Sequence, residues 1–394
     1  MLNASNIEPM LPAEGTYPQL IDLATDLVAK SNMLAGRLHP IVIKSVGNLV
    51  RSMNCYYSNL IEGHDTHPLD IEKALSNDFS NDIKKRELQL EAKAHIEVQR
   101  KIDFDIFPFS ISSDYILWLH HEFCAHLPDD LLIIEDLKTR TKRIVEPGQY
   151  RNNFVQVGQH IPPAPDKIPV FITRFIEAYN PQRLTKIQQI IAVAASHHRL
   201  LWIHPFLDSN GRVTRLFSHA FLRHIGIGSS LWSISRGLAR SVDEYRARLM
   251  AADSARHGDL DGRGALSAKE LYNFCQFFLE CCLDQINYME NLIEPTQLSR
   301  RIEIYVKEEI ISGRLPKGAE HLLREALITG EIERGQASNI TGYQERQART
   351  ILNALVSEKL LISDTPKSAV RLNFPISIVE RWFPRLYPIS TRNT

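Results

Sequence analysis

Residues 204–215 read HPFLDSNGRVTR, and they bring together side chains that could carry out a reaction. His204 is the one side chain here whose unperturbed pKa lies near neutral pH, which makes it the candidate general base. Asp208 has the wrong charge for direct contact with a phosphate, but a carboxylate can hold Mg²⁺ between phosphate oxygens. A base and a metal-binding carboxylate this close together indicate nucleotide-dependent group transfer.

The second half of the same stretch predicts an anion-binding site. Gly211 and the turn before it lead into a helix that we expect to begin near Arg212, and free backbone N–H groups at a helix start attract phosphate. Arg212 and Arg215 are three positions apart, so both guanidinium groups can reach one anion. Taken singly, these residues are better explained by an ordinary His-Pro turn, an Asn-Gly turn and a solvated face. The twelve-residue combination favours the functional interpretation.

This stretch resembles the signature motif of Fic-domain proteins, His-x-Phe-x-Asp/Glu-Gly-Asn-Gly-Arg-x-x-Arg. An apolar helix ending in HHRLLWI precedes it, and the upstream segment VEPGQYR…VGQHIPPAP…IPVF is similar to the flap that positions the target in that family. The resemblance covers about 110 to 290. The positions that match are His204, Phe206, Asp208, Asn210, Gly211, Arg212 and Arg215.

The resemblance implies transfer of AMP from ATP, with Mg²⁺, to a Tyr, Ser or Thr hydroxyl of a target protein. His204 would accept the proton of the attacking hydroxyl, Phe206 would hold the loop in the core, and Asp208 would bind Mg²⁺. Arg212 would contact the phosphate chain and Arg215 the γ-phosphate, while Asn210 and the loop amides would cradle the α- and β-phosphates. The implied nucleotide-binding set is Ser209, Asn210, Gly211, Arg212, Val213, Thr214, Arg215 and Tyr245.

Ser209 departs from the motif, because the family usually has Gly at this position. If the turn needs a positive φ, a Ser there costs about 1 kcal/mol more than a Gly. Its Cβ would narrow the approach of the phosphate, whereas its hydroxyl could donate a hydrogen bond to it. We expect a working site with altered affinity or nucleotide preference, which leaves open transfer of another phosphate-containing group, as in Doc-type kinases.

A second motif, SNLIEG at residues 58–63, predicts a brake on this site. Ser58 and Glu62 lie on one helix face, and Gly63 is a plausible helix stop. A Glu near a helix end is usually just solvated, but Ser-x-x-x-Glu-Gly resembles the inhibitory motif that accompanies many Fic domains. By that resemblance, Glu62 would pair with Arg215 and occupy the γ-phosphate position, because a carboxylate and a phosphate compete for the same guanidinium.

The elements that must position these residues are mostly helical. Apolar residues recur at helical spacing over 20–38 and 41–63 and through most of the chain to residue 292, which predicts a mainly α fold of the Fic type. Between 138 and 169 the sequence is rich in loops, with a Pro147-Gly148 turn and an alternating NFVQVG at 153–158. This region is predicted to form a small β-hairpin flap.

Three domains are expected, because 394 residues exceed what one core usually sustains. They are an N-terminal helical region with the inhibitory helix (1–109), a Fic catalytic domain (110–295) and a winged helix-turn-helix domain (296–394). The last prediction rests on the order helix, Gly-containing turn, helix and two short strands.

The predicted helix over 345–358 could read DNA, because it has an outward polar face and a buried apolar stripe. The outward set is Arg346, Gln347, Arg349, Thr350 and Asn353, and the buried set is Ala348, Ile351, Leu352, Leu355 and Val356. From 299 to 394, fifteen Lys and Arg against eleven Asp and Glu is a weak positive charge for this purpose. Protein contacts or dimerisation are an equally good interpretation of such a domain.

Composition restricts the surroundings of the protein. Lys plus Arg and Asp plus Glu both number 46, so a polyanion would have to bind a local patch. Five Cys without metal-type spacing favour reduced thiols and the cytoplasm, and neither a signal peptide nor a membrane-spanning stretch is expected. A DNA-binding regulator that senses a nucleotide is the alternative to an enzyme, but a sensor does not need His204. A homodimer stays open, since an inhibitory helix can act within or across chains.

Overall fold

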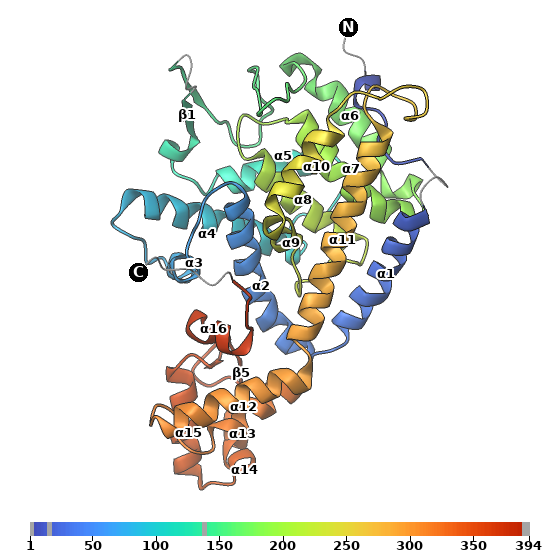
Figure 1. Cartoon of the computed structure of the whole chain (residues 1–394). Coiled ribbons are helices and arrows are strands. Elements are labelled where there is room, and N and C mark those ends of the chain that lie inside the picture. The colour runs from blue at the N-terminus through green and yellow to red at the C-terminus, as the bar shows by residue number, and fades with distance from the viewer. Residues whose placement is uncertain (1–3, 14–17, 136–139, 388–394) are drawn as a thin grey trace. The chain divides into compact units, whose positions relative to one another are not determined.

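The computed structural model describes residues 4–13, 18–135 and 140–387 (Figure 1). Most of these residues lie in α-helices and the strands form two small antiparallel sheets, which confirms the predicted mainly α fold. The chain divides into two compact units. Unit 1 comprises 1–31, 54–229 and 233–285, and unit 2 comprises 32–53, 230–232 and 286–394. Helices α1 (Pro18–Ala35), α2 (Pro40–Ile61) and α11 (Ala268–Leu292) contribute residues to both units.

The centre of unit 1 is the helix pair α7 (Lys186–Ile203) and α8 (Asn210–His224) (Figure 1). Helix α7 starts in a capping box between Thr185 and Gln188, which satisfies its first backbone N–H groups. Helix α6 (Ile168–Tyr179) packs against α7, while α4 (Ile83–Asp103) and α5 (Ser113–Cys124) pack against α8. The shared core is rich in fully buried aromatic rings, namely Phe171, Phe175, Phe206, Phe217 and Phe221. This packing fixes both ends of the α7–α8 loop.

Shorter elements complete unit 1. Of these, α9 and α10 lie between α8 and α11 in the sequence, and α3 precedes α4 and packs against it. Their bounds are η1 (Ala4–Ile7), α3 (Pro68–Leu75), η2 (Asp129–Leu132), η3 (Pro165–Lys167), η4 (Pro181–Arg183), α9 (Ile234–Arg240) and α10 (Val242–Ala252).

The hairpin of unit 1 lies earlier in the chain than predicted. Strands β1 (Ile133–Glu135) and β2 (Lys142–Ile144) pair antiparallel, and residues 136–139 between them lie outside the described residues. The predicted strand over 153–158 is wrong, because this stretch makes only one isolated bridge, from Val157 to His160. Its backbone is held by a side chain instead, since Arg151 donates to the carbonyls of Asn153 and Pro163.

Unit 2 contains a three-stranded antiparallel sheet of order β3-β5-β4. Helix α15 (Glu345–Ser357) buries Ala348, Ile351, Leu352 and Leu355 as predicted, while Val356 is only half buried. The other elements are α12 (Pro295–Ile311), α13 (Ala319–Thr329), β3 (Glu331–Ile332), η5 (Arg334–Gln336), α14 (Ala337–Thr341), β4 (Leu361–Ile362), β5 (Val370–Leu372) and α16 (Ile376–Trp382).

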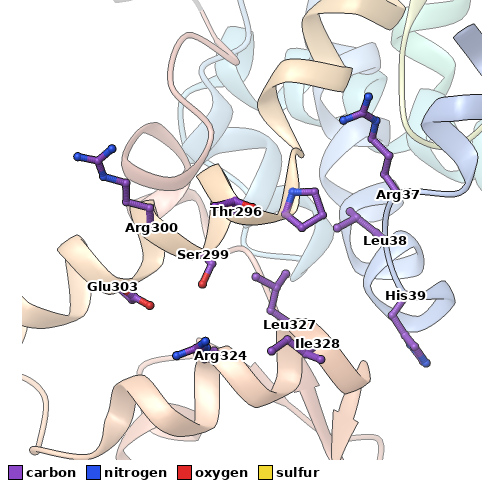
Figure 2. Close-up of a pocket in the computed structure, with 11 residues that line it drawn as sticks. Arg37, Leu38, His39, Thr296, Ser299, Arg300, Glu303, Arg324, Leu327 and Ile328 are labelled. Carbon is purple, nitrogen blue, oxygen red and sulfur yellow. The ribbon is translucent and has the colours of Figure 1, made fainter.

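An open cavity of about 510 Å³ lies within unit 2 (Figure 2). Its lining combines the arginines Arg37, Arg300 and Arg324 with apolar side chains such as Leu327 and Ile328. None of residues 204–215 lines it, so this cavity does not coincide with the predicted chemistry.

Two expectations about the whole chain can be compared with the described residues. All five cysteines are free and buried, which agrees with the prediction of buried thiols. Among the helices of the described part of the chain, none combines the length and the apolar character that a membrane crossing requires.

Candidate active site

The α7–α8 loop turns sharply at two residues with left-handed backbones. His204, directly after α7, has φ 47° and ψ 61°, and Ser209, directly before α8, has φ 63° and ψ 12°. The loop is also held from outside, because Arg151 donates from its backbone N to the Pro205 carbonyl (2.9 Å) and from Nε to the His204 carbonyl (2.8 Å). These constraints place the predicted base and the start of α8 in one rigid turn.

His204 is a neutral imidazole in this environment. Burial, and after it the positive charges of Arg151 and His160, lowers its pKa to about 4. The sequence alone suggests a group that titrates near neutral pH. In the structure the ring is ready to accept a proton throughout the physiological range.

Phe206 anchors the loop in the core, as the motif predicts. Its buried ring stacks on His120 with centroids 3.9 Å apart and an interplanar angle of 4°. His120 in turn accepts a hydrogen bond from the Gly148 backbone N at Nδ1 (2.9 Å). The loop is therefore tied to α5 and to the Pro147-Gly148 turn.

Asn210 has a different task from the predicted one. Its Nδ2 donates to the Phe206 carbonyl (2.8 Å) and its Oδ1 accepts from the Phe206 backbone N (2.9 Å). Both polar groups of the side chain are thus used inside the loop, and Asn210 is almost fully buried. What this residue can offer an anion is its backbone N–H at the start of α8.

Ser209 has a positive φ, which is the backbone conformation in which a Ser is more strained than a Gly. Its buried hydroxyl accepts a hydrogen bond from Arg212 Nη2 at 3.3 Å. The Ser side chain is therefore part of the environment of Arg212, which a Gly could not provide.

Arg212 is buried and contacted on several sides. Its guanidinium group lies 4.9 Å from the centroid of the Phe123 ring, and its Nη2 lies 3.5 Å from Asp208 Oδ2. On the other side, Nη1 is 3.0 Å from Oε1 of Glu91, a residue of α4. The paired carboxylates keep this arginine charged despite its burial, and the net effect raises its pKa.

Asp208 suits a magnesium ion only in part. Its side chain is 45% exposed and contacts Arg212. Within the described ranges, no group of three His, Cys, Asp or Glu is close enough to form a metal site by itself. Mg²⁺ is commonly held by one or two carboxylates together with substrate phosphates and water, so one carboxylate at the mouth of an anion site fits that pattern.

Arg215 is buried against the motif at residues 58–63. Its Nε donates to Ser58 Oγ (2.9 Å), and its Nη2 donates to the Ser58 carbonyl (3.0 Å) and to Glu62 Oε1 (2.5 Å). Burial alone would raise the pKa of Glu62, but Arg215 and Arg212 lower it overall, so the carboxylate is ionised. Gly63, with φ 88°, ends the turn that carries Glu62.

Glu62 also covers the first turn of α8. A Cβ atom at Gly211 would overlap Glu62 Oε1 and crowd Arg215. The carboxylate thus lies where backbone N–H groups and two arginines would receive an anion. Any phosphate bound there has to displace it.

Comparison with known proteins identifies this part of the chain. Residues 110–222 match the model of the Fic/DOC family. The chain contains a Fic domain. Over 82 residues it is 37% identical to the protein adenylyltransferase Fic of Drosophila erecta and 35% identical to that of Drosophila virilis. Each alignment covers 21% of this chain and 17% of the relative, so most of both proteins lies outside it.

Solved structures share the architecture of the Fic domain at low sequence identity. A Fic family protein from Desulfovibrio desulfuricans is 16% identical, with a TM-score of 0.53 over 92% of this chain and 98% of its own. Fic-1 (residues 134–508) from C. elegans is also 16% identical, with a TM-score of 0.55 over 70% of this chain and 73% of its own. At this identity the likeness concerns the fold.

Three residues of the predicted nucleotide-binding set have buried side chains. Val213 and Thr214 are buried in α8, so only their backbone could contact a nucleotide. Tyr245 is buried as well, its hydroxyl lies 2.8 Å from His197 Nε2, and Arg215 is close enough to act on its electrostatic environment. Tyr245 therefore supports Arg215 from behind.

A buried polar stripe on α4, which packs against α8, was missed from the sequence. Besides Glu91, it contains His95, Gln99 and Asp103, each one helical turn from the last. Asp103 Oδ1 lies 2.9 Å from His219 Nε2 of α8, and burial, followed by Arg215, lowers the pKa of His95 to about 3. The i, i+4 spacing in ELQLEAKAHIEVQRKID was the available signal.

Proposed function

We propose that this Fic domain is a protein adenylyltransferase that transfers AMP from ATP to a Tyr, Ser or Thr hydroxyl of a target protein. The observation that carries the proposal is the meeting of a neutral His204 with two arginines at the start of α8 in one rigid loop. The adenylyltransferase names of the relatives support the same reaction.

The reaction follows from the chemistry of these residues. His204 accepts the proton of the target hydroxyl, whose oxygen attacks the α-phosphorus of ATP. The bond from the α-phosphorus to the bridging oxygen breaks, and pyrophosphate leaves with that oxygen. Arg212, Arg215 and the first backbone N–H groups of α8 hold the phosphate chain and offset its charge. Mg²⁺, held by Asp208 and phosphate oxygens, would neutralise further negative charge.

The segment over 151–163 supports a protein as the acceptor. It is fixed to the His204 turn by Arg151, and it exposes apolar side chains, including Phe154 (71% exposed) and Ile161 (73% exposed). Large apolar groups exposed beside a catalytic base are suited to contact another protein. In our proposal this segment is the target-positioning flap.

We further propose that Glu62 inhibits the transfer. Its carboxylate binds the guanidinium of Arg215 and lies over Gly211, so it competes with the γ-phosphate for both. ATP bound beside it would place its α-phosphorus badly for attack. Ser58 helps by holding the other donors of Arg215.

A labelling experiment tests these proposals together. Wild type, Glu62→Gly and Glu62→Gly/His204→Ala proteins are incubated with ATP labelled at the α- or the γ-phosphate, and label on protein is measured. Label from the α-phosphate alone that disappears without His204 supports AMP transfer. Label from the γ-phosphate would instead indicate a kinase. If no variant carries label from either phosphate, a nucleotide-sensing regulator is favoured.

For residues 296–394 we propose a winged helix-turn-helix domain that contacts double-stranded DNA. The observation in favour is that all five predicted outward residues of α15 are exposed, namely Arg346, Gln347, Arg349, Thr350 and Asn353. Strand β3 precedes α14 and α15, strands β4 and β5 follow them, and the sheet order β3-β5-β4 suits such a domain. Fluorescence anisotropy with random duplex DNA at several salt concentrations tests it. Equal binding by wild type and Arg346→Ala/Arg349→Ala proteins would contradict it.

A further inference from the structure

Glu91 contacts two residues that belong to different parts of the site. Its Oε1 lies 3.0 Å from Arg212 Nη1, and its Oε2 accepts a hydrogen bond from His64 Nδ1 at 2.6 Å. Glu91 is buried on α4, and its contact with Arg212 is buried on both sides, whereas the His64 side chain is 38% exposed. Neither Glu91 nor His64 belongs to the Fic motif or to SNLIEG.

The contact with Arg212 fixes the position of that guanidinium group. Phe123 covers one face of the group, and the Asp208 carboxylate and the Ser209 hydroxyl share Nη2. Glu91 is the carboxylate at Nη1, on the α4 side, and it is much more buried than Asp208. Arg212 has five N–H donors, so donors remain for a phosphate while Glu91 stays in place.

The contact with His64 reaches the inhibitory turn. His64 follows Gly63, and its backbone N donates to the Asn59 carbonyl (2.9 Å), which closes the turn after α2. The same turn carries Glu62, two residues earlier. Hydrogen bonding to Glu91 raises the pKa of His64, which favours its charged form beside the carboxylate. One carboxylate therefore joins the turn of Glu62 to the arginine nearest the phosphate chain.

We propose that Glu91 is a positioning residue of the Fic domain, which holds Arg212 in place for the phosphates of ATP and, through His64, holds the turn that carries Glu62. The inference rests on the proposed function, since it concerns the same nucleotide site. A positioning role for Glu91 and a role as a second inhibitory carboxylate predict opposite effects on ATP binding. A positioning residue improves ATP binding, whereas a competitor for Arg212 weakens it.

The test uses Glu91→Gln, which keeps the shape of the side chain but removes its charge, in the full chain carrying Glu62→Gly. We expect the Kd for a fluorescent ATP analogue, and the KM for ATP, to rise about tenfold, because the buried carboxylate charge that holds Arg212 Nη1 is removed. The kcat should change much less, because His204 is untouched. Glu97→Gln is the matched control, since Glu97 lies on the same helix and pairs only with Arg100 on the surface.

A double-mutant comparison separates positioning from general destabilisation. In a chain that already carries Arg212→Ala, Glu91→Gln should cause no further loss of nucleotide binding, because its effect passes through Arg212. Thermal unfolding of each variant shows whether it folds. Unchanged or tighter binding in the folded Glu91→Gln protein would overturn the proposal, and so would an equal loss with and without Arg212.

The second arm concerns His64. His64→Gln should raise AMP transfer several-fold in the chain with Glu62 and should have no effect in the Glu62→Gly chain. An equal effect in both chains would overturn this part. Nucleotide binding is measured without turnover, so a failure of AMP transfer would count against the proposed function and leave the test of Glu91 intact.

Discussion

Glu62 Oε1 lies 2.5 Å from Nη2 of Arg215, and the two residues are 153 positions apart in the sequence. The arginine is 2% exposed, whereas the carboxylate is 34% exposed. This asymmetry suits a contact in which the arginine is the fixed member and the carboxylate is the one that can leave. Because Gly211 has no side chain, the carboxylate can rest directly against the start of α8.

The first prediction concerns removal of this contact. Glu62→Gly should raise AMP transfer about tenfold or more, because the carboxylate no longer competes with the phosphate for a charge-assisted hydrogen bond from Arg215. Glu62→Gln should raise it less, since the amide can still accept a bond from Arg215. Self-labelling with α-labelled ATP measures both, with Glu97→Gln as the surface control. Equal labelling of wild type and Glu62→Gly would show that the contact does not inhibit.

The pH dependence of the activated protein is the second prediction. The pKa of His204 lies at about 4, below its ordinary value, so the base is deprotonated and active above that pH and is lost as the pH falls through it. In the Glu62→Gly protein, ionisation of His204 should therefore cause no change in kcat/KM between about pH 6 and 8. A profile that falls with a midpoint near 6.5 would mean that the imidazole is more exposed to water than the structure indicates.

Ser209 provides the third prediction. With φ at 63°, Ser209→Gly relieves backbone strain but adds flexibility to the unfolded chain, so the free energy of unfolding should change by less than about 1 kcal/mol. Ser209→Val should lower it by about 2 kcal/mol or more, because a β-branched residue is strongly disfavoured at positive φ. Urea unfolding measures both values. Similar stabilities for the two variants would contradict the assigned backbone conformation.

The sequence predicted the motif residues and their partner better than it predicted their surroundings. The pairing of Glu62 with Arg215 is present in the structure. It could be predicted because the resemblance to a known motif carries information about long-range contacts, which helical periodicity lacks. The bonds of the Asn210 side chain to the Phe206 backbone could not be predicted, because an amide suits a phosphate and a loop carbonyl equally well and only the fold brings Phe206 within its reach.

Two further differences have physical causes. The alternation in NFVQVG is typical of a strand, but Arg151 uses the carbonyls of Asn153 and Pro163, and the hairpin forms at 133–144 instead. The stripe from Glu91 to Asp103 was not recognised from the sequence, because charged residues usually mark an exposed helix face. It is buried since α8 supplies Arg212 and His219 opposite it. Predicting such pairing across the core requires knowledge of which helices pack against each other.

Arg151 provides the last prediction. It holds the His204 carbonyl with Nε and the Pro163 carbonyl with Nη2, so it connects the base to the flap over 151–163. In the Glu62→Gly background, Arg151→Ala should lower kcat about tenfold or more with little change in the KM for ATP, because the base is displaced while the phosphate site at α8 is intact. Arg151→Lys should not restore the rate, since an ammonium group cannot reproduce the forked contacts. Steady-state kinetics on both variants measure the effect, with Arg183→Ala, at an exposed arginine of η4, as the control. A rise in KM without a fall in kcat would instead assign Arg151 to nucleotide binding.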